Sequence, residues 1–404
     1  MERKVIQVEE RPPLLLNIPL SIQHLFAMFG ATVLVPFLFN VNPTTCLFMN
    51  GIGTLLYLFL TKGKIPSYLG SSFAFISPVM VILSTSSYSD AQSGFIVFGL
   101  IFILFSLIIK YTGTGWIDII FPPACMGAII AVIGLELAPT AAGMAGLTGD
   151  VIDFRNIAVS MFTLAVTIIG SVAFKGFMAI IPILFGVICG YIFSFFMGLV
   201  DLAPVAAAPW FQMPHFYQPT FNLNAILIIA PAALVVLAEH IGHLVVTGNV
   251  VERNLIKDPG LARSLFADGC SNVLSGFFGA TPNTTYGENI GVMAITKVYS
   301  VWVIGGAAVM AICLSFVGKL SELIRSIPVP VMGGVCILLF GVIAASGIRV
   351  LVESKVDYSK SANLVMSSVI MIVGLSGAKL TFGTISVQGM VLATLVAILM
   401  SLTF

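Results

Sequence analysis

The sequence predicts an all-α polytopic membrane protein, with fourteen transmembrane segments arranged as two inverted repeats of seven. Three observations support this fold class: the scarcity of charge, the number of long apolar runs, and a likeness between the two halves of the chain. Of the 404 residues, 58% are hydrophobic and 9% are charged, whereas a soluble domain carries about 25% charged residues. Such a chain cannot cover a water-facing surface, and its net charge of +1 leaves no basic patch for nucleic acid.

Apolar runs long enough to cross a bilayer recur along the whole chain. A helix needs about 20 apolar residues to span the hydrocarbon core. Two segments, 66–86 and 281–297, are apolar but broken by proline, glycine and polar residues, so short extended stretches are expected inside the third and tenth spans. The uninterrupted candidates are 19–40, 45–61, 93–110, 116–138, 157–174, 177–199, 224–248, 264–279, 299–317, 328–348, 362–378 and 384–404.

The basic residues support this count and predict that both termini lie on the cytoplasmic side. With the N-terminus inside, most Lys and Arg residues fall in cytoplasmic loops, as the positive-inside rule expects. Omitting one broken span would invert every loop after it and remove this asymmetry. The inner set is Arg3, Lys4, Arg11, Lys62, Lys64, Lys110, Lys175, Arg253, Lys257, Arg263, Lys297, Arg349, Lys355 and Lys360, and the outer set is Arg155, Lys319, Arg325 and Lys379.

Three matches in the same order relate the two halves. The segment 48–59 aligns with 266–277, and FPPACMGAII at 121–130 aligns with IPVPVMGGVC at 327–336. The third match pairs IQHL, which begins at Ile22, with AEHI, which begins at Ala238. Because seven is an odd number, the second half is upside down relative to the first. Inverted repeats with a broken helix at the same place in each half are typical of secondary transporters.

Charged side chains within predicted spans mark the candidate functional site, because a charge at the bilayer centre costs about 2.5–3.5 kcal/mol. Glu239 and His243 are four residues apart and share one helix face. A buried carboxylate beside an imidazole can hold a proton. His240 points about 100° away from Glu239, so we interpret it as a histidine bonded to a neighbouring helix. No metal site is predicted, because neither a cysteine nor a third histidine accompanies the pair.

The broken spans predict a second part of the same site. A half-helix that begins near Gly287 leaves free backbone N–H groups at the membrane midplane, with Glu288 in its first turn. Its counterpart in the first half is the break at Ser72 and Phe73. Two such breaks aim backbone donors at one point. With carboxylates as acceptors and Phe73 or Tyr286 against a ring, the arrangement suits a flat neutral ring with alternating N–H and C=O groups, such as a nucleobase.

The same residues resemble a known family, the nucleobase–ascorbate or nucleobase–cation symporter-2 family. ENIGVMAITK at 288–297 matches the family signature, in which an acidic or amide residue precedes Asn-x-Gly, four further residues, Thr and a basic residue. The resemblance covers nearly the whole chain and is closest to the uracil-carrying branch. The other matching motifs are ERPPLL, QHLFAMFGATVLVP, GSSFAFISP, AEHIGHLVVT and ATPNTTYGEN.

The resemblance implies a proton-coupled symporter that imports uracil across a bacterial cytoplasmic membrane by alternating access, with no enzymatic activity and no cofactor. It implies a core domain of residues 15–110 and 224–317, and a gate domain of residues 111–223 and 318–404. Uracil, the proton, membrane lipid and a second copy of the chain, bound through the gate domain, are the expected partners. The alternative within the family is a carrier of xanthine, uric acid or another nucleobase. Purine-carrying branches of the family usually have Gln at the position of Glu288, so this residue distinguishes the two interpretations.

The resemblance also assigns roles to the site residues. Glu239 and Glu288 bind the base, and His243 couples the proton together with Glu239. The backbone N–H groups of Phe73 and Gly287 contact the carbonyls of the base, and Tyr286 and Ser72 complete the site. The chain departs from the family pattern at two gate positions, Cys336 and Phe340, where relatives carry Ser and Tyr.

Overall fold

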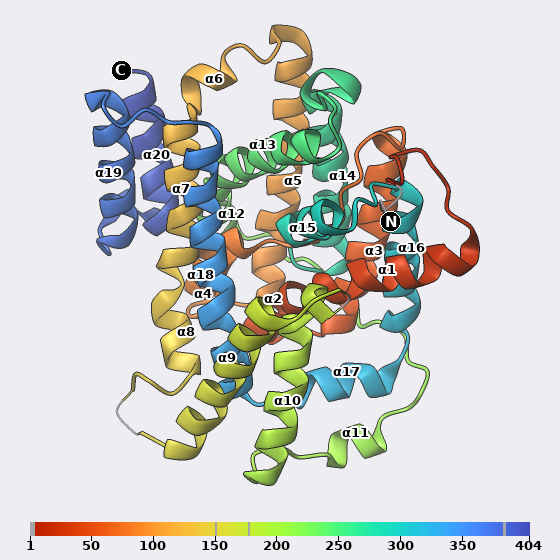
Figure 1. Cartoon of the computed structure of the whole chain (residues 1–404). Helices are drawn as coiled ribbons and strands as arrows, with labels where there is room; N and C mark the ends of the chain where they lie inside the picture. The colour runs from red at the N-terminus through yellow and green to blue at the C-terminus, as the bar shows by residue number, and fades with distance from the viewer. Residues whose placement is uncertain (1–4, 150–151, 177, 383–384) are drawn as a thin grey trace.

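The computed structural model describes residues 5–149, 152–176, 178–382 and 385–404. Within these residues the chain is almost entirely helical (Figure 1). Seven helical stretches of the described residues are long and apolar enough to cross a membrane, three of them made of two consecutive helices, and five shorter apolar helices accompany them. Arg3 and Lys4 of the inner basic set lie outside the described residues, as do the first residues of the predicted spans 177–199 and 384–404.

In the first half of the chain, each of the seven predicted spans is occupied by a helix or by a group of consecutive short elements. Proline accounts for one of the breaks between consecutive helices: Pro139 follows the junction at Leu137, and a proline has no N–H for the helix ladder. The elements are α1 (Leu14–Ala27), α2 (Phe29–Leu38), α3 (Pro43–Leu60), β1 (Leu69–Ser71), η1 (Phe73–Phe75), α4 (Ile76–Leu83), α5 (Tyr88–Thr112), α6 (Ile117–Ile120), α7 (Pro123–Glu136), α8 (Ala138–Met144), α9 (Phe154–Ala173), η2 (Met178–Ile180) and α10 (Pro182–Phe196).

The second half repeats this order after the short helix α11 (Ala203–Ala207). Its first span is divided at Pro231, which lies directly before the longer part of the span. The elements are α12 (Leu223–Ile229), α13 (Ala232–Val250), η3 (Ile256–Gly260), α14 (Leu261–Phe278), β2 (Asn283–Thr285), α15 (Gly287–Thr296), α16 (Val301–Ser315), α17 (Gly318–Arg325), α18 (Val329–Glu353), α19 (Ser361–Leu375), β3 (Lys379–Phe382), β4 (Ile385–Gln388) and α20 (Gly389–Ser401).

The helix packing confirms the inverted repeat. Helix α5 packs against α14, and α16 packs against α3. The first pair joins the fourth span to the ninth, and the second pair joins the eleventh span to the second. Each contact in one half therefore has an equivalent seven spans away, as a repeat of seven requires. In the same way, α9 packs on α18 and α19 packs on α7. Figure 1 shows the resulting arrangement, in which α7, α18, α19 and α20 stand beside α3, α5, α14 and α16.

The predicted breaks in the third and tenth spans are confirmed as two short strands that pair with each other. Strands β1 and β2 are antiparallel, with Leu69 opposite Thr285 and Ser71 opposite Asn283. The hydroxyl of Tyr286 donates to the carbonyl of Ser71 at 3.0 Å. A Cβ at Gly70 would overlap the ring of Tyr286, so glycine is needed here. This pairing satisfies backbone groups that the interrupted helices leave free within the membrane.

Helices α7 and α18 approach each other closely because small residues lie between them. A Cβ at Gly127 would lie 2.8 Å from the carbonyl oxygen of Gly347, and a Cβ at Gly347 would lie 2.9 Å from the Cα of Ala131. Glycine at such contacts brings backbones together, as is common between transmembrane helices. This contact fixes the side of α18 that faces the broken spans.

Candidate substrate-binding site between the broken spans

A cavity of about 340 Å³ lies where the two broken spans meet α13, α7 and α18. Six of the seven side chains or backbone positions proposed from the sequence line it: Phe73, Glu239, His243, Tyr286, Gly287 and Glu288. Residues more than 200 positions apart in the chain are thus brought to one place. Ser72 is buried just behind the lining, where its N–H donates to the carbonyl of Pro282 at 2.8 Å.

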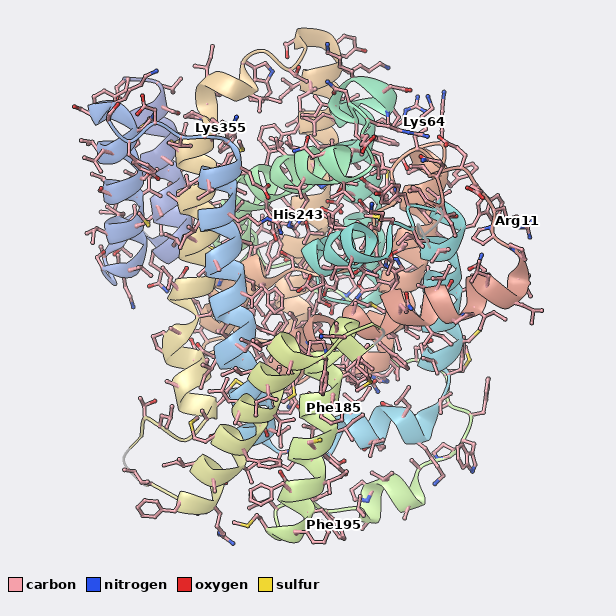
Figure 2. All side chains as sticks on the ribbon, viewed as in Figure 1. Arg11, Lys64, Phe185, Phe195, His243 and Lys355 are labelled. Atoms are coloured by element: carbon pink, nitrogen blue, oxygen red, sulfur yellow. The ribbon has the colours of Figure 1, made fainter. Side chains whose placement is uncertain are left out.

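Helix α13 presents Glu239 and His243 to this cavity from successive turns. Within the described residues, Glu239 Oε2 is buried without a hydrogen-bond partner, so the carboxylate has an acceptor available to a ligand. His243 Nδ1 lies 3.1 Å from the hydroxyl of Thr285, not from Glu239. The imidazole therefore joins α13 to the end of β2, and Figure 2 shows it in the middle of the molecule.

Two half-helices begin at the cavity, and neither has a side-chain N-cap. Strand β1 is followed by Ser72 and then by the helix that starts at Phe73, and strand β2 is followed by Tyr286 and then by α15. Phe73 and Gly287 are therefore structurally equivalent in the two repeats. The first N–H groups of an uncapped helix are free donors and carry a partial positive charge, which gives the cavity two sets of donors.

Gly287 also lets the imidazole come close to the start of α15. A Cβ at this position would lie 3.3 Å from His243 Nε2, tighter than an ordinary contact. Glu288 follows in the first turn of α15, where the helix dipole favours an acidic side chain. The cavity thus combines two carboxylates, an imidazole and backbone donors, a set that can bind a ring with both N–H and C=O groups.

Sequence reasoning missed the residues that α7 and α18 contribute to the lining. Ile130 comes from α7, while Val342, Ser346, Arg349 and Glu353 come from α18. The residues on α18 are spaced three or four apart, so one helix face was recognisable in the sequence, but nothing there shows what it faces. Arg349 Nε donates to Glu353 Oε1 at 2.6 Å. The cavity thus extends to the end of α18, toward the side where Lys355 and Lys64 lie (Figure 2).

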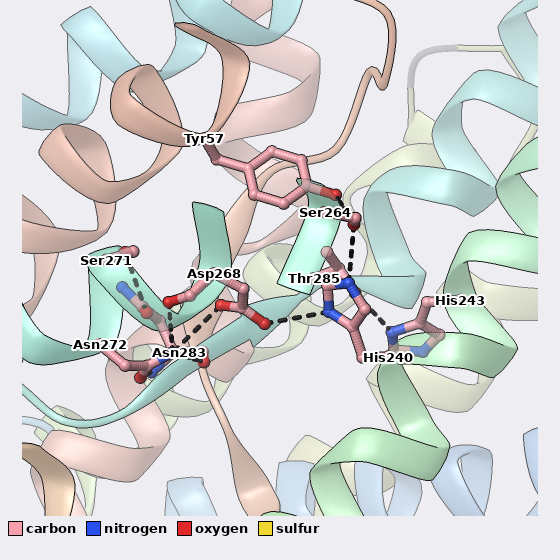
Figure 3. A network of polar contacts seen from close by, with 9 residues as sticks. All are labelled: Tyr57, His240, His243, Ser264, Asp268, Ser271, Asn272, Asn283 and Thr285. Atoms are coloured by element: carbon pink, nitrogen blue, oxygen red, sulfur yellow. Dashed lines mark hydrogen bonds and ion pairs between the residues drawn. The ribbon is translucent and has the colours of Figure 1, made fainter. Parts of the chain in front are cut away.

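His240 points away from the cavity, which confirms its interpretation as a histidine bonded to a neighbouring helix. Its Nε2 lies 2.7 Å from the hydroxyl of Ser264, and its Nδ1 lies 3.0 Å from Asp268 Oδ2. Ser264 also contacts the hydroxyl of Tyr57 at 2.6 Å, and Asn272 donates to Asp268 at 3.1 Å. Figure 3 shows this network, which holds α13, α14 and α3 together behind the cavity.

Comparisons with known proteins agree with the fold and the motifs. A family described as the permease family matches residues 16–383. The chain is 64% identical to the uracil permease of Escherichia coli (strain K12), over all of this chain and 95% of the relative. It is 47% identical to the uracil permease of Bacillus subtilis (strain 168), over 95% of this chain and 91% of that one.

A solved structure shares the architecture. The transmembrane domain of a cyanobacterium bicarbonate transporter, BicA, superposes with a TM-score of 0.68 and 14% sequence identity, covering 98% of this chain and all of the other. At this identity the likeness concerns the fold alone, and it supports fourteen segments in two inverted repeats.

Proposed function

We propose, from the premise that this chain belongs to the permease family, that it imports uracil together with a proton across a bacterial cytoplasmic membrane. The observation that carries this proposal is the meeting of Glu239, His243, Glu288 and two uncapped helix N-termini at one cavity. The high identity to uracil permeases supports the choice of base, and Glu288, where purine carriers usually have Gln, favours uracil over xanthine or uric acid.

The donors and acceptors of the cavity complement those of uracil. The two ring N–H groups donate to Glu239 and Glu288, and the ring carbonyls accept from the backbone N–H groups of Phe73 and Gly287. The aromatic rings of Phe73 and Tyr286, both buried, offer apolar surface to the flat base. Hydrogen bonds to charged groups contribute about 1.5–3 kcal/mol each, so the two carboxylates dominate both affinity and orientation.

The proposed alternating access is supported by the position of the cavity between two groups of helices. Its lining comes from η1, α13 and α15, within residues 15–110 and 224–317, and from α7 and α18, within residues 111–223 and 318–404. The first group is the proposed core and the second the proposed gate. Movement of one against the other exposes the cavity to each side in turn, as in other inverted-repeat transporters.

Uracil is neutral and cannot accumulate by itself in response to the membrane potential, so its accumulation needs a coupling ion. We propose that this ion is a proton. One charge crossing at about 150 mV gains about 3.5 kcal/mol, which corresponds to accumulation of several hundredfold. Glu239 and His243 are the residues proposed to hold and release this proton.

Uptake of labelled uracil into proteoliposomes tests the proposal. We expect accumulation when the outside is acidic, collapse of that accumulation with a protonophore, and no dependence on sodium. Competition by a panel of uracil, thymine, xanthine and uric acid then ranks the substrates. Uptake driven by a sodium gradient, or competition that is stronger with xanthine than with uracil, would contradict the proposed coupling or the proposed substrate.

A further inference from the structure

Glu136 is a carboxylate within the predicted span 116–138 that lies outside the binding cavity. It ends α7, and its side chain links two other elements. Ser77 of α4 donates its hydroxyl to Glu136 Oε1 at 2.9 Å. The backbone N–H of Met390, in the first turn of α20, donates to Oε2 at 2.8 Å. Carboxylates inside membrane spans are costly and are typically functional, so a role for this one is expected.

The N-terminus of α20 is shaped to receive this carboxylate. Gly389 begins α20 with a φ of +55°, a backbone conformation that glycine adopts without strain. A Cβ at this position would overlap the carboxylate of Glu136. The helix N-terminus then stabilises the negative charge through its dipole and its free N–H groups. The Glu136 carboxylate is therefore held in place by α7 and α20, which both belong to the proposed gate.

The other partner belongs to the half-helix that carries Phe73. Ser77 lies about one turn after Phe73, and the contacts of the two residues show that both face the proposed gate. Along this face, the ring of Phe73 makes an edge contact with the ring of Phe340 in α18, with centroids 6.0 Å apart and planes at 83°. Two successive turns of the half-helix thus contact the proposed gate, one through an aromatic edge and one through a charge-assisted hydrogen bond.

We infer that Glu136 is a positioning residue of the transport cycle, which holds the Phe73 half-helix against the gate while the cavity is open on the side of Arg349 and Glu353. This inference rests on the proposed function, because it requires the core to move against the gate. When the cavity opens to the other side, the half-helix separates from α7 and α20, and the Ser77–Glu136 bond breaks. The Glu136–Met390 bond stays, because both residues belong to the gate.

The packing beside the bond is compatible with this separation. A small cavity of about 90 Å³ lies between α4 and α20, and Ser77, Val81 and Met390 are among its lining residues. The two helices are therefore not tightly packed at this point, and the hydrogen bond from Ser77 joins α4 to the carboxylate that the first turn of α20 holds. The bond stabilises one state of the carrier and not the other, so its loss shifts the equilibrium between the two states.

Measurement of uracil exchange from each face of the membrane tests this inference. The apparent affinity at one face is the intrinsic affinity reduced by the fraction of carriers open to that face. The ratio of the inside to the outside half-saturating concentration therefore reports the equilibrium directly. In right-side-out and inside-out vesicles, we expect Ser77→Ala to raise this ratio by about threefold to tenfold, and Ser77→Thr, which keeps the hydroxyl, to restore it.

Ser84→Ala is the matched control, because the hydroxyl of Ser84 donates to Val81 O within its own helix. Glu136→Gln should shift the ratio in the same direction, and the double variant should show less than the sum of the two effects. Saturable uracil exchange by the unmodified protein at both faces establishes the premise, and its absence would contradict the proposed function. With exchange present, an unchanged ratio in Ser77→Ala would overturn the role of Glu136.

Discussion

His243 Nδ1 lies 3.1 Å from the hydroxyl of Thr285, the last residue of β2. This contact places the imidazole between the end of a strand and the start of a half-helix, with Nε2 turned toward Gly287. The two ring nitrogens thus have different surroundings, and the hydrogen bond at Nδ1 influences which tautomer is present. His243 therefore joins α13 directly to the broken tenth span, where the base is proposed to bind.

Thr285→Val should weaken the hold on this imidazole while preserving the shape of the side chain. We expect uracil binding to fall by about threefold to tenfold, or about 0.7–1.4 kcal/mol, and proton-driven accumulation to fall with it. Calorimetric titration and vesicle uptake measure the two effects. Thr163→Val is the control, because the hydroxyl of Thr163 is buried and donates to the carbonyl of Val159 within its own helix. Equal losses of uracil binding in the two variants would argue against a role for Thr285.

Glu239 and His243 should separate binding from coupling. We expect Glu239→Ala to abolish binding and transport together, because it removes an acceptor that no protein group occupies. His243→Ala should leave measurable binding, weakened about tenfold, or about 1.4 kcal/mol, but should remove accumulation driven by a pH gradient. Binding is measured by titration, and accumulation by uptake into vesicles with an imposed pH difference.

Counterflow distinguishes the two roles further. Exchange of uracil does not require the return of an empty carrier, so in His243→Ala it should survive better than net uptake. Normal proton-driven accumulation in His243→Ala would show that the histidine does not couple the proton. Normal uracil binding by Glu239→Ala would remove that carboxylate from the site.

Glu288→Gln should weaken uracil binding without disturbing the fold. The substitution keeps the size of the side chain but replaces a charged acceptor, which leaves a weaker hydrogen bond to a ring N–H. The expected loss is about 1–3 kcal/mol, measured by calorimetric titration, with thermal unfolding unchanged. Glu322→Gln, in α17 and away from the cavity, is the matched control and should bind uracil normally. If Glu288→Gln also bound uracil as tightly as the unmodified protein, the assignment of Glu288 to the site would be wrong.

The network behind the cavity should matter for stability. Asp268→Ala removes the partner of His240 and leaves a buried ring nitrogen without a hydrogen bond, which costs about 1–3 kcal/mol. Thermal unfolding in detergent measures this loss. Asp357→Ala, which removes a solvent-exposed carboxylate, should have little effect. Unfolding temperatures that fall equally in the two variants would show that the network has no special contribution.

The N-terminal segment should loosen in acid. Arg253 donates to the carboxylate of Glu9, with 2.8 Å between Nη2 and Oε2, and this hydrogen bond lowers the pKa of Glu9 below its ordinary value of 4.5. A lowered pKa means that the ion pair is fully formed above pH 4.5 and is lost as the pH falls through the folded-state value. The protection of the amides of residues 5–10 against hydrogen exchange, relative to their intrinsic exchange rates, should therefore fall as the pH drops below 4.5, an effect that Glu9→Gln should remove.

The sequence by itself determined the class of the protein, the number of its crossings and the two broken spans. These properties depend on the transfer of about 20 neighbouring side chains into lipid and on local interruptions such as Pro282 and Gly287, so they can be recognised within a short window. It also indicated Glu239, His243, Glu288, Phe73 and Tyr286, because charge and helix breaks inside a span are costly and therefore conspicuous.

Only the tertiary structure decided which groups these residues meet. His243 contacts Thr285 and not Glu239, Ser346 reaches the cavity from α18, and Glu136 joins Ser77 to Met390. Such contacts depend on how each helix is rotated and on how closely neighbouring helices approach each other. Between α7 and α18, glycines such as Gly127 and Gly347 allow the close approach. Hydropathy is similar on every side of a buried transmembrane helix, so this information arises when the helices pack together.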